Sequence, residues 1–154
     1  MSEKPLEKEV YRNYIRFYNS IVAEISAFLK NYGLTLTQFD VLESVKNAGR
    51  NGLPLLKIGE SLVSRQPDVT RIVDRLEAMG VITRIRDTKD RRIVYVKPTK
   101  SGLGLFEKLE PLIFEIHRDQ FGHLLKTELK TFNKTLFNLS GKADSSSLIR
   151  ASCS

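Results

Sequence analysis

The sequence predicts a mostly α-helical protein of the α+β class, and three observations lead to this prediction. Apolar residues recur with helical spacing over long stretches near both ends of the chain. Between those stretches, residues 66–92 have the pattern of a helix, a β-strand and a short turn. That turn carries a cluster of cations at Lys89, Arg91 and Arg92. A helix that fits a groove, followed by a basic hairpin, is typical of a winged helix-turn-helix.

The first predicted helix covers residues 10–29 and ends at 31–33. Its apolar stripe is wide, and the members are Val10, Tyr14, Phe17, Tyr18, Ile21, Val22, Ile25, Phe28 and Leu29. So broad a face needs more partner surface than a small domain supplies, which favours dimerisation. A larger monomeric core is the alternative.

The second helix is predicted to begin with a capping box, in which Thr35 is the N-cap and Gln38 is its partner. Leu34 and Phe39 flank the cap as an apolar pair. The helix ends near residue 49, and its expected buried row is Leu36, Phe39, Leu42 and Val45. A turn at 51–54 leads into a short extended piece, and a brief helix over 56–63 then directs Ile58 and Leu62 inward.

The next helix is predicted over residues 67–79, with Pro67 in its first turn and Gly80 as a left-handed C-terminal cap. The expected buried residues are Val69, Ile72, Val73, Leu76 and Met79. The opposite face is centred on Pro67, Thr70, Arg71, Asp74 and Ala78, with Gln66 at its leading edge.

A strand over 81–86, a turn over 87–90 and a return strand over 91–96 form the predicted hairpin. Thr99 is expected to cap a helix over 100–125, which Pro111 should bend or interrupt. The apolar row of that helix is Phe106, Leu109, Ile113 and Ile116. A last helix over 128–139, capped by Thr127, is expected to bury Leu129, Phe132, Leu136 and Leu139. Residues 141–154 are predicted to be a flexible tail.

Charge favours a polyanionic partner. The chain has 154 residues and a formal net charge of +7. Seven cations and two anions lie between Arg84 and Lys100, so this segment alone carries 7 − 2 = +5. Nucleic acid is therefore favoured over an anionic membrane, and a solubilising surface is the alternative.

The composition also argues against several classes of protein. No apolar leader and no run of about 18 apolar residues occur, so neither a signal peptide nor a membrane span is expected. The single cysteine, Cys153, fits a reducing cytoplasm. No nucleophile has a base partner and no glycine-rich phosphate loop occurs, so an enzyme is not expected. His117 and His123 are six residues apart and lack zinc-site spacing, so neither a metal nor a cofactor is predicted.

This order of elements resembles the MarR family of bacterial and archaeal transcriptional regulators. The segments that carry the resemblance are LTLTQFDVL (34–42), IGESL (58–62), DVTRIVDRLEAMGVITR (68–84), DTKDRRIVYV (87–96) and PTKSG (98–102). Val63, Ser64 and Arg65 depart from the usual turn, Pro98 replaces an apolar residue, and the cysteine of the peroxide-sensing branch is absent. The resemblance implies one domain over 1–140, with a winged core over 35–98 and dimerisation helices over 8–31 and 99–140.

The residues nearest the start of the groove helix are expected to read bases, and these are Gln66, Pro67, Thr70 and Arg71. Ser64 and Arg65 are expected to contact the DNA backbone, and Asp74 to orient an arginine. In the wing, Lys89 is expected to contact phosphate. One of Arg91 and Arg92 enters the minor groove, and the other braces the turn against Asp87 or Asp90. A solvated side chain is the alternative for each cation.

The resemblance further implies that the end helices interlock in a homodimer through Val10, Tyr14, Phe17, Ile21, Ile113, Ile116, Phe132 and Leu136. It also implies a small-molecule effector site, for which Tyr11, Tyr14, Tyr18, His117 and His123 are candidates; packed helix residues are the alternative. The expected function is a cytoplasmic, ligand-responsive repressor that binds a pseudo-palindromic operator on double-stranded DNA. A non-specific DNA-binding or protein-interaction module is the other hypothesis.

Overall fold

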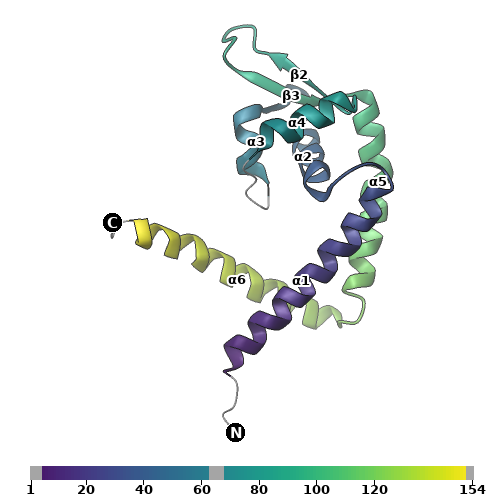
Figure 1. Cartoon of the computed structure of the whole chain (residues 1–154). Helices are drawn as coiled ribbons and strands as arrows, with labels where there is room; N and C mark the ends of the chain where they lie inside the picture. The colour runs from purple at the N-terminus through teal and green to yellow at the C-terminus, as the bar shows by residue number, and fades with distance from the viewer. Residues whose placement is uncertain (1–4, 63–67, 152–154) are drawn as a thin grey trace. The chain divides into compact units, whose positions relative to one another are not determined.

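The computed structural model describes residues 5–62 and 68–151, with side chains described as far as residue 140. The elements in chain order are α1 (Leu6–Lys30), α2 (Leu36–Asn47), the 3-10 helix η1 (Gly49–Asn51), β1 (Leu53–Pro54), α3 (Leu55–Ser61), α4 (Val69–Ala78), β2 (Ile82–Arg86), β3 (Val94–Pro98), α5 (Lys100–Gln120) and α6 (Lys126–Ala151) (Figure 1). The predicted fold class is confirmed, because long helices flank a winged helix-turn-helix. The chain divides into two units, Met1–Phe114 and Glu115–Ser154, which are described separately.

In the first unit, α1 begins at Leu6, earlier than predicted, and ends at Lys30, and Gly33 in the following turn is left-handed with φ of 70°. The Leu34 N–H donates to the Leu29 carbonyl at 3.2 Å and closes the helix end. Only the C-terminal part of α1 is buried, at Ile25 and Leu29. The N-terminal half of α1 extends away from the end of this unit that carries the β2–β3 hairpin (Figure 1).

Helix α2 has the predicted capping box. The Thr35 N–H donates to Gln38 Oε1 at 2.8 Å, and the Gln38 N–H donates to Thr35 Oγ1 at 3.2 Å. Its buried face is wider than predicted, because α2 contacts α1, α3, α4 and β3. Val41 is therefore buried in addition to the expected row, whereas Leu36 is only half-buried.

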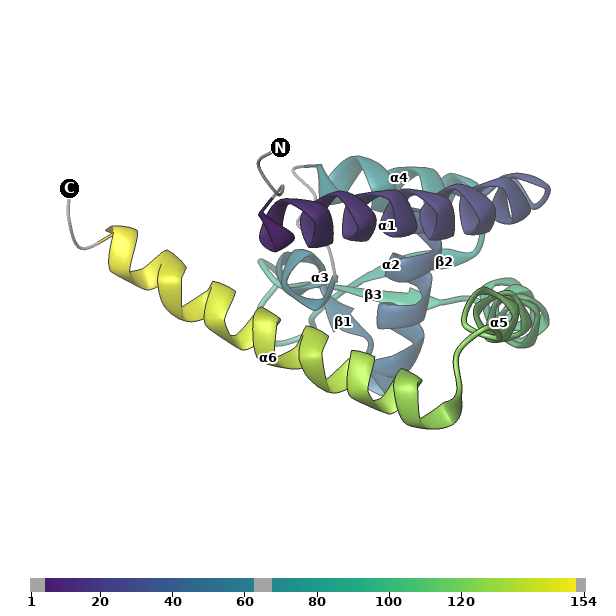
Figure 2. The same ribbon diagram turned by 90° about the horizontal axis from the view of Figure 1, so that it is seen from below.

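The three strands form an antiparallel sheet in the order β1-β3-β2. Val96 is the register partner of Leu53 in β1 and of Arg84 in β2. Figure 2 shows β1 and β3 next to α2 and α3, which cover this part of the sheet. The return strand begins at Val94 and not at residue 91 as predicted, because the wing turn includes the residues up to Ile93.

Helix α4 begins at Val69, two residues later than predicted. Asp68 is its N-cap, and Asp68 Oδ1 accepts a hydrogen bond from the Arg71 N–H at 3.1 Å. Pro67, which the sequence places in the first turn of this helix, lies outside the described residues, so its role stays a prediction. Gly80 ends the helix as predicted, with φ of 72° and with the Val81 N–H bonded to the Leu76 carbonyl at 3.2 Å.

The buried side of α4 is narrower than predicted. Val73 and Leu76 are buried, and Val69 and Ile72 are half-buried. Met79 is 40% exposed, contrary to expectation. Met79 follows the last helical residue, at the point where the chain turns away toward β2, so its side chain leaves the buried row.

Thr99 joins the end of α4 to the start of α5. Its Oγ1 donates to the Gly80 carbonyl at 2.6 Å and accepts from the Gly102 N–H at 3.0 Å, which confirms the predicted cap. The Thr99 N–H donates to the Val81 carbonyl at 3.0 Å. Gly102 lies against this backbone, because a Cβ on Gly102 would stand 1.9 Å from the Val81 carbonyl oxygen.

Helix α5 passes through Pro111 without a break and ends at Gln120, before the predicted end at residue 125. Phe106, Leu109 and Ile113 are buried as expected, and Ile116 is half-buried. A turn follows, in which the Gly122 N–H donates to the Asp119 carbonyl at 3.2 Å.

In the second unit, α6 begins at Lys126. The Leu125 N–H donates to Glu128 Oε2 at 2.8 Å, so the N-cap is Leu125 and the predicted cap at Thr127 is wrong. Leu139 is 58% exposed, contrary to prediction, whereas Leu129, Phe132 and Leu136 are half-buried.

The backbone of α6 remains helical to Ala151, beyond the predicted end near Leu139. Residues 140–151 contain no proline, so every backbone N–H in this stretch can take part in the helix. The helix therefore extends into the segment 141–154 that was predicted to be a tail. The flexibility of that segment stays a prediction.

Candidate nucleic-acid interface

The outward face of α4 has the predicted composition. Thr70, Arg71, Asp74 and Ala78 are all exposed. Arg71 Nε lies 3.3 Å from Asp68 Oδ2, so the residue that caps the helix also orients this guanidinium group. Asp68 therefore supports a neighbouring cation, while Thr70 and Arg71 face outward near the helix N-terminus.

Four predicted contact residues, Ser64, Arg65, Gln66 and Pro67, lie outside the described residues. Their roles stay predictions.

The wing turn is shaped by two aspartates. Asp87 Oδ1 accepts hydrogen bonds from the Lys89 N–H at 2.6 Å and from the Asp90 N–H at 3.0 Å. The Asp87 N–H donates to the Ile93 carbonyl at 2.9 Å and closes the base of the turn. Asp87 thus holds backbone groups and does not brace an arginine.

Asp90 provides the brace. Its carboxylate accepts from Arg92 Nε and Arg92 Nη2, each at 3.0 Å, and also from the Arg92 N–H at 3.0 Å. These hydrogen bonds from Arg92 lower the pKa of Asp90, and the hydrogen bond to Asp90 raises the pKa of Arg92. Of the two arginines that the sequence offered for bracing the turn, Arg92 is therefore the one that does so. Arg91 is exposed and forms no ion pair with any side chain that the structure describes.

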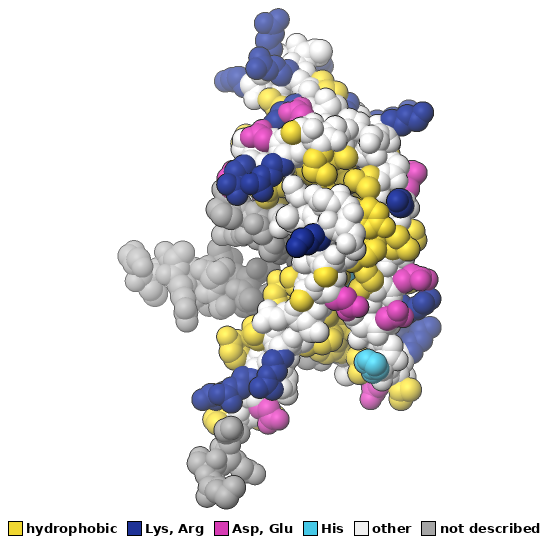
Figure 3. All heavy atoms as spheres, turned by 45° about the vertical axis from the view of Figure 1, so that its right-hand side comes forward, with side chains coloured by type: hydrophobic (Ala, Val, Ile, Leu, Met, Phe, Trp, Pro, Cys, Tyr) yellow, Lys and Arg dark blue, Asp and Glu magenta, His cyan; other side chains and the backbone are white. Residues whose placement is uncertain are grey.

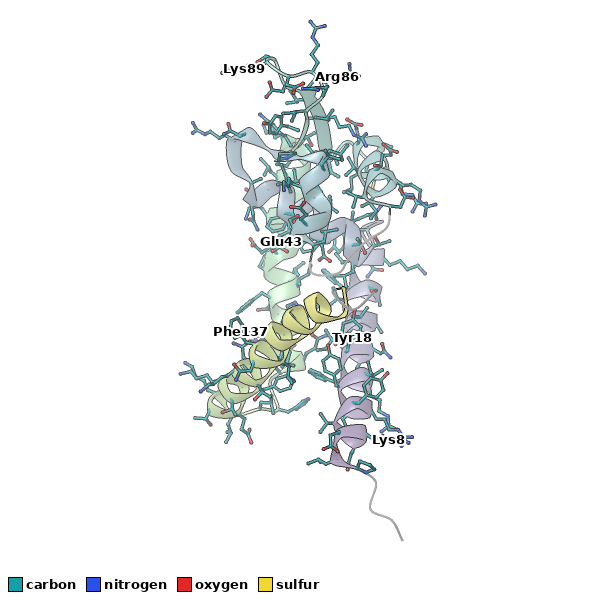
Figure 4. All side chains as sticks on the ribbon, turned by 90° about the vertical axis from the view of Figure 1, so that its left-hand side faces the viewer. Lys8, Tyr18, Glu43, Arg86, Lys89 and Phe137 are labelled. Atoms are coloured by element: carbon teal, nitrogen blue, oxygen red, sulfur yellow. The ribbon has the colours of Figure 1, made fainter. Side chains whose placement is uncertain are left out.

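Cations gather over the hairpin. Figure 3 shows dark blue side chains at the end of the molecule that carries the β2–β3 hairpin. Figure 4 places Lys89 at the tip of this hairpin and Arg86 close by, at the end of β2. The exposed cations of the hairpin and the outward face of α4 belong to the same structural unit.

Arg84 is the residue that sequence reasoning missed. Its Nη2 donates to Asp74 Oδ1 at 2.5 Å and to the Thr70 carbonyl at 3.4 Å, and its Nη1 donates to Glu77 Oε2 at 2.5 Å. Partial burial lowers the pKa of Arg84, but hydrogen bonds and charges from Asp74 and Glu77 outweigh it, so the pKa is raised. The expected arginine partner of Asp74 is thus Arg84. The sequence did contain a sign of this role. Side chains alternate between the two faces of a β-strand, so Arg84 shares the face of buried Ile82.

The predicted dimerisation residues differ in exposure. Val10 and Tyr14 are exposed. Ile113 is buried within its own unit, so it has little surface left for a partner. The remaining members are half-buried, namely Phe17, Ile21, Ile116, Phe132 and Leu136.

The effector candidates are divided between the two units. Tyr11, Tyr14 and Tyr18 are exposed on α1, and the rings of Tyr14 and Tyr18 stack at 6.4 Å. His117 belongs to the second unit, where its Nδ1 lies 3.2 Å from Gln120 Oε1. His123 is exposed in the same unit. A hollow of about 340 Å³ on α1 is lined by other residues, namely Lys8, Glu9, Arg12, Asn13 and Arg16.

The described part of the chain contains no cluster of three His, Cys, Asp or Glu residues that could hold a metal ion. None of the helices within residues 5–62 and 68–151 combines the length and apolar character needed to cross a bilayer.

The fold and the surface together define a winged helix-turn-helix protein. The model of the MarR family matches residues 34–94. The HTH-type transcriptional regulator MhqR of Bacillus subtilis (strain 168) is 31% identical over 111 residues, which are 72% of this chain and 74% of MhqR. The HTH-type transcriptional repressor MdtR of the same organism is 33% identical over 92 residues, or 60% of this chain and 58% of MdtR.

The fold is similar to that of a solved structure of Bordetella bronchiseptica BpsR, with a TM-score of 0.75. The DNA binding of BpsR is described as regulated by 6-hydroxynicotinic acid. The BpsR chain is 27% identical, and the match covers 86% of this chain and 98% of that chain. The chain belongs to the MarR family of transcriptional regulators, whose members bind DNA and are not enzymes.

Proposed function

We propose that this chain is a sequence-specific repressor that binds a pseudo-palindromic operator on double-stranded DNA as a homodimer. The observation that carries the proposal is the combination, in one unit, of an outward-facing helix N-terminus and a hairpin with exposed cations. The chromosome of a bacterium or archaeon lies in the cytoplasm, so the proposal includes that location.

Helix α4 is the recognition helix of this proposal. An α-helix fits the major groove of B-DNA, and residues near its N-terminus reach base edges. The exposure of Thr70 and Arg71 supports this role for them, and Gln66 and Pro67, which precede them in sequence, are proposed to share it. Ser64 and Arg65 are proposed to contact the DNA backbone.

The wing is proposed to contact the neighbouring backbone and minor groove. Arg91 is the better candidate for the minor groove, because Arg92 is already committed to Asp90. Lys89 is proposed to bind phosphate, and Arg92 to hold the shape of the turn while it adds positive potential.

The homodimer is supported by apolar surface that one chain leaves uncovered. Val10 and Tyr14 on α1, and Phe137 and Leu139 on α6, are all exposed. A two-fold dimer would present two recognition helices to half-sites about 10 base pairs apart. The half-buried members of the predicted set would then complete the interface, and these are Phe17, Ile21, Ile116, Phe132 and Leu136.

Regulation by a small molecule and repression are supported by relatives. DNA binding by BpsR is regulated by 6-hydroxynicotinic acid, and MdtR is described as a repressor. In this chain, Tyr11, Tyr14 and Tyr18 offer exposed aromatic surface to a planar organic ligand, with His117 and His123 as further candidates. A ligand that favours one spacing of the two recognition helices would shift DNA affinity.

The test is selection of duplex DNA from a random library by the purified chain. Selected duplexes should contain inverted half-sites about 10 base pairs apart. At about 150 mM salt they should bind roughly 10³-fold or more tightly than a scrambled duplex. Equal affinities would favour the alternative function, a non-specific DNA-binding or protein-interaction module. With the selected duplex placed across a reporter promoter, the chain should lower expression; increased expression would contradict repression.

A further inference from the structure

We propose that Arg84 is a positioning residue for DNA binding, which holds the wing against the recognition helix so that both meet one duplex in a fixed geometry. This inference rests on the proposed DNA-binding function. Arg84 lies on the strand β2 and is not among the residues of α4 and the wing that are proposed to contact DNA directly.

The guanidinium of Arg84 spans two turns of α4. It bonds the Thr70 carbonyl in the first turn, then the Asp74 carboxylate and then the Glu77 carboxylate. Residues 70, 74 and 77 follow one stripe of the helix, because they are spaced by four and three positions. One side chain of β2 therefore touches α4 from its N-terminal turn, where the proposed base contacts lie, to its last turn.

The backbone of β2 is held by the same partner. β2 is an edge strand in the order β1-β3-β2, so one side of it has no strand neighbour. On this strand the Arg84 N–H donates to Glu77 Oε1 at 3.0 Å. Glu77 thus fixes both the main chain and the side chain of Arg84. Rotation of the hairpin about β2 would break these contacts together.

Charge also favours positioning over direct DNA contact. Asp74 is exposed on the face that carries Thr70 and Arg71, and an unpaired carboxylate there would repel phosphate. Arg84 pairs with both Asp74 and Glu77 and is itself only 23% exposed. Its Nη1 and Nη2 groups already donate to protein oxygens, so it has few donors left for DNA. A lysine could not reproduce this fork of contacts.

The experiment is a double-mutant cycle on full-length protein with the duplex selected by the wild type. Arg91→Ala removes the proposed wing contact, and Arg84→Gln removes the link between the wing and α4. If Arg84 positions the wing, Arg91→Ala will weaken binding less in the Arg84→Gln background than in the wild type. We expect the factor by which Arg91→Ala weakens binding to be about threefold or more larger in the wild type than in the Arg84→Gln background, which is within the range of coupled pairs.

Arg86→Gln is the matched control. Arg86 lies two residues further along β2 on the same face, is exposed, and forms no ion pair with the side chains described. This change removes the same charge from the same strand. Arg86→Gln and Arg91→Ala should therefore act independently, with factors that multiply.

The outcomes separate the possibilities. Independent effects of Arg84→Gln and Arg91→Ala overturn the inference and indicate a direct phosphate contact or a purely structural role. Wild-type affinity in Arg91→Ala also overturns it, because the wing then has no contact to position. If circular dichroism shows that Arg84→Gln does not fold, Asp74→Ala is used in its place. The inference is overturned if Arg91→Ala weakens DNA binding by the same factor in the Asp74→Ala background as in the wild type. It is supported if that factor is smaller. Failure of the wild type to prefer its selected duplex would instead refute the proposed function.

Discussion

Arg91 and Arg92 are neighbours with the same side chain and different surroundings. Arg92 forms two parallel hydrogen bonds with Asp90, and among the described side chains Arg91 has no acidic partner. Asp90 occupies two of the five guanidinium donors of Arg92 and offsets its charge, whereas Arg91 keeps all its donors for DNA. The two residues should therefore contribute differently to binding.

We predict that Arg91→Ala weakens binding to the selected duplex by about 1–3 kcal/mol and reduces the salt slope by about 1. Arg92→Ala should weaken binding less, because it leaves Arg91 in place and mainly loosens the turn. Fluorescence anisotropy titrations between about 50 and 200 mM salt measure both quantities. A larger loss for Arg92→Ala would show that the roles are reversed.

Asp40 on α2 is predicted to make stability depend on pH. Burial, with a smaller effect from Glu43, raises the pKa of Asp40 from 3.8 to about 6. The folded state then binds a proton more tightly than the unfolded state, so the free energy of unfolding falls as pH rises from about 4 to 6. Because Asp40 is partly exposed, screening leaves about 1–2 kcal/mol of this effect.

Asp40→Asn should therefore stabilise the protein by about 1–2 kcal/mol at pH 7.5 and by almost nothing at pH 4. Urea unfolding at the two pH values gives the comparison. The same gain at both values would mean that the charge of Asp40 is not responsible.

At the scale of elements, the contact between the end of α4 and the start of α5 is very close. Thr99 links the two helix ends, and Gly102 brings the backbone of α5 against Val81. Further along α5, the ring of Phe106 stacks on Phe39 of α2 at 5.4 Å. The first part of α5 is thus attached to the recognition helix through backbone and to α2 through packing.

Two glycines of α5 should respond in opposite directions. Gly102→Ala should destabilise the fold by about 3 kcal/mol, because its Cβ would meet a backbone oxygen that cannot move alone. Gly104→Ala should stabilise it by about 0.5–1 kcal/mol, because no atom lies within 4 Å of the added Cβ. Chemical denaturation of both variants is the measurement, and equal effects would contradict the close contact.

For the whole molecule, large apolar side chains are exposed in both units. Val10, Tyr11, Tyr14 and Tyr18 on α1, and Leu125, Phe137 and Leu139 in the second unit, are all exposed. Where exposed apolar residues form a large patch, they mark interaction sites in soluble proteins. A second copy of the chain is the proposed cover.

Sedimentation should therefore give a dimer, with a melting temperature that rises with protein concentration. Val10→Asp should shift the equilibrium toward monomer, because Val10 is 55% exposed in one chain but would be buried between two. Leu56→Asp is the control, since Leu56 is 90% exposed on α3, outside the proposed interface. A monomeric wild type, or equal effects of both changes, would refute the dimer.

Local signals in the sequence predicted most of this fold. The capping box of Thr35 and Gln38, the left-handed Gly80 and the cap at Thr99 depend on a few adjacent residues and were confirmed. The errors arose where distant parts of the chain decide. Helix α4 begins later than predicted, at Val69, because the side chain of Asp68 caps it, and Ile113 proved buried within its unit. Arg84 was missed because its three partners on α4 come together only when β2 packs beside that helix.

The residues that support the wing form one short segment with it, which affects how such proteins can diversify. Asp68, Thr70, Asp74, Glu77 and Arg84 lie close together in sequence, and the wing follows directly. A genetic recombination event that exchanged residues 64–98 would transfer the proposed DNA-contacting residues together with the residues that brace the wing. Descendants would then acquire a new DNA target in one step, while the helices proposed to form the dimer stayed unchanged.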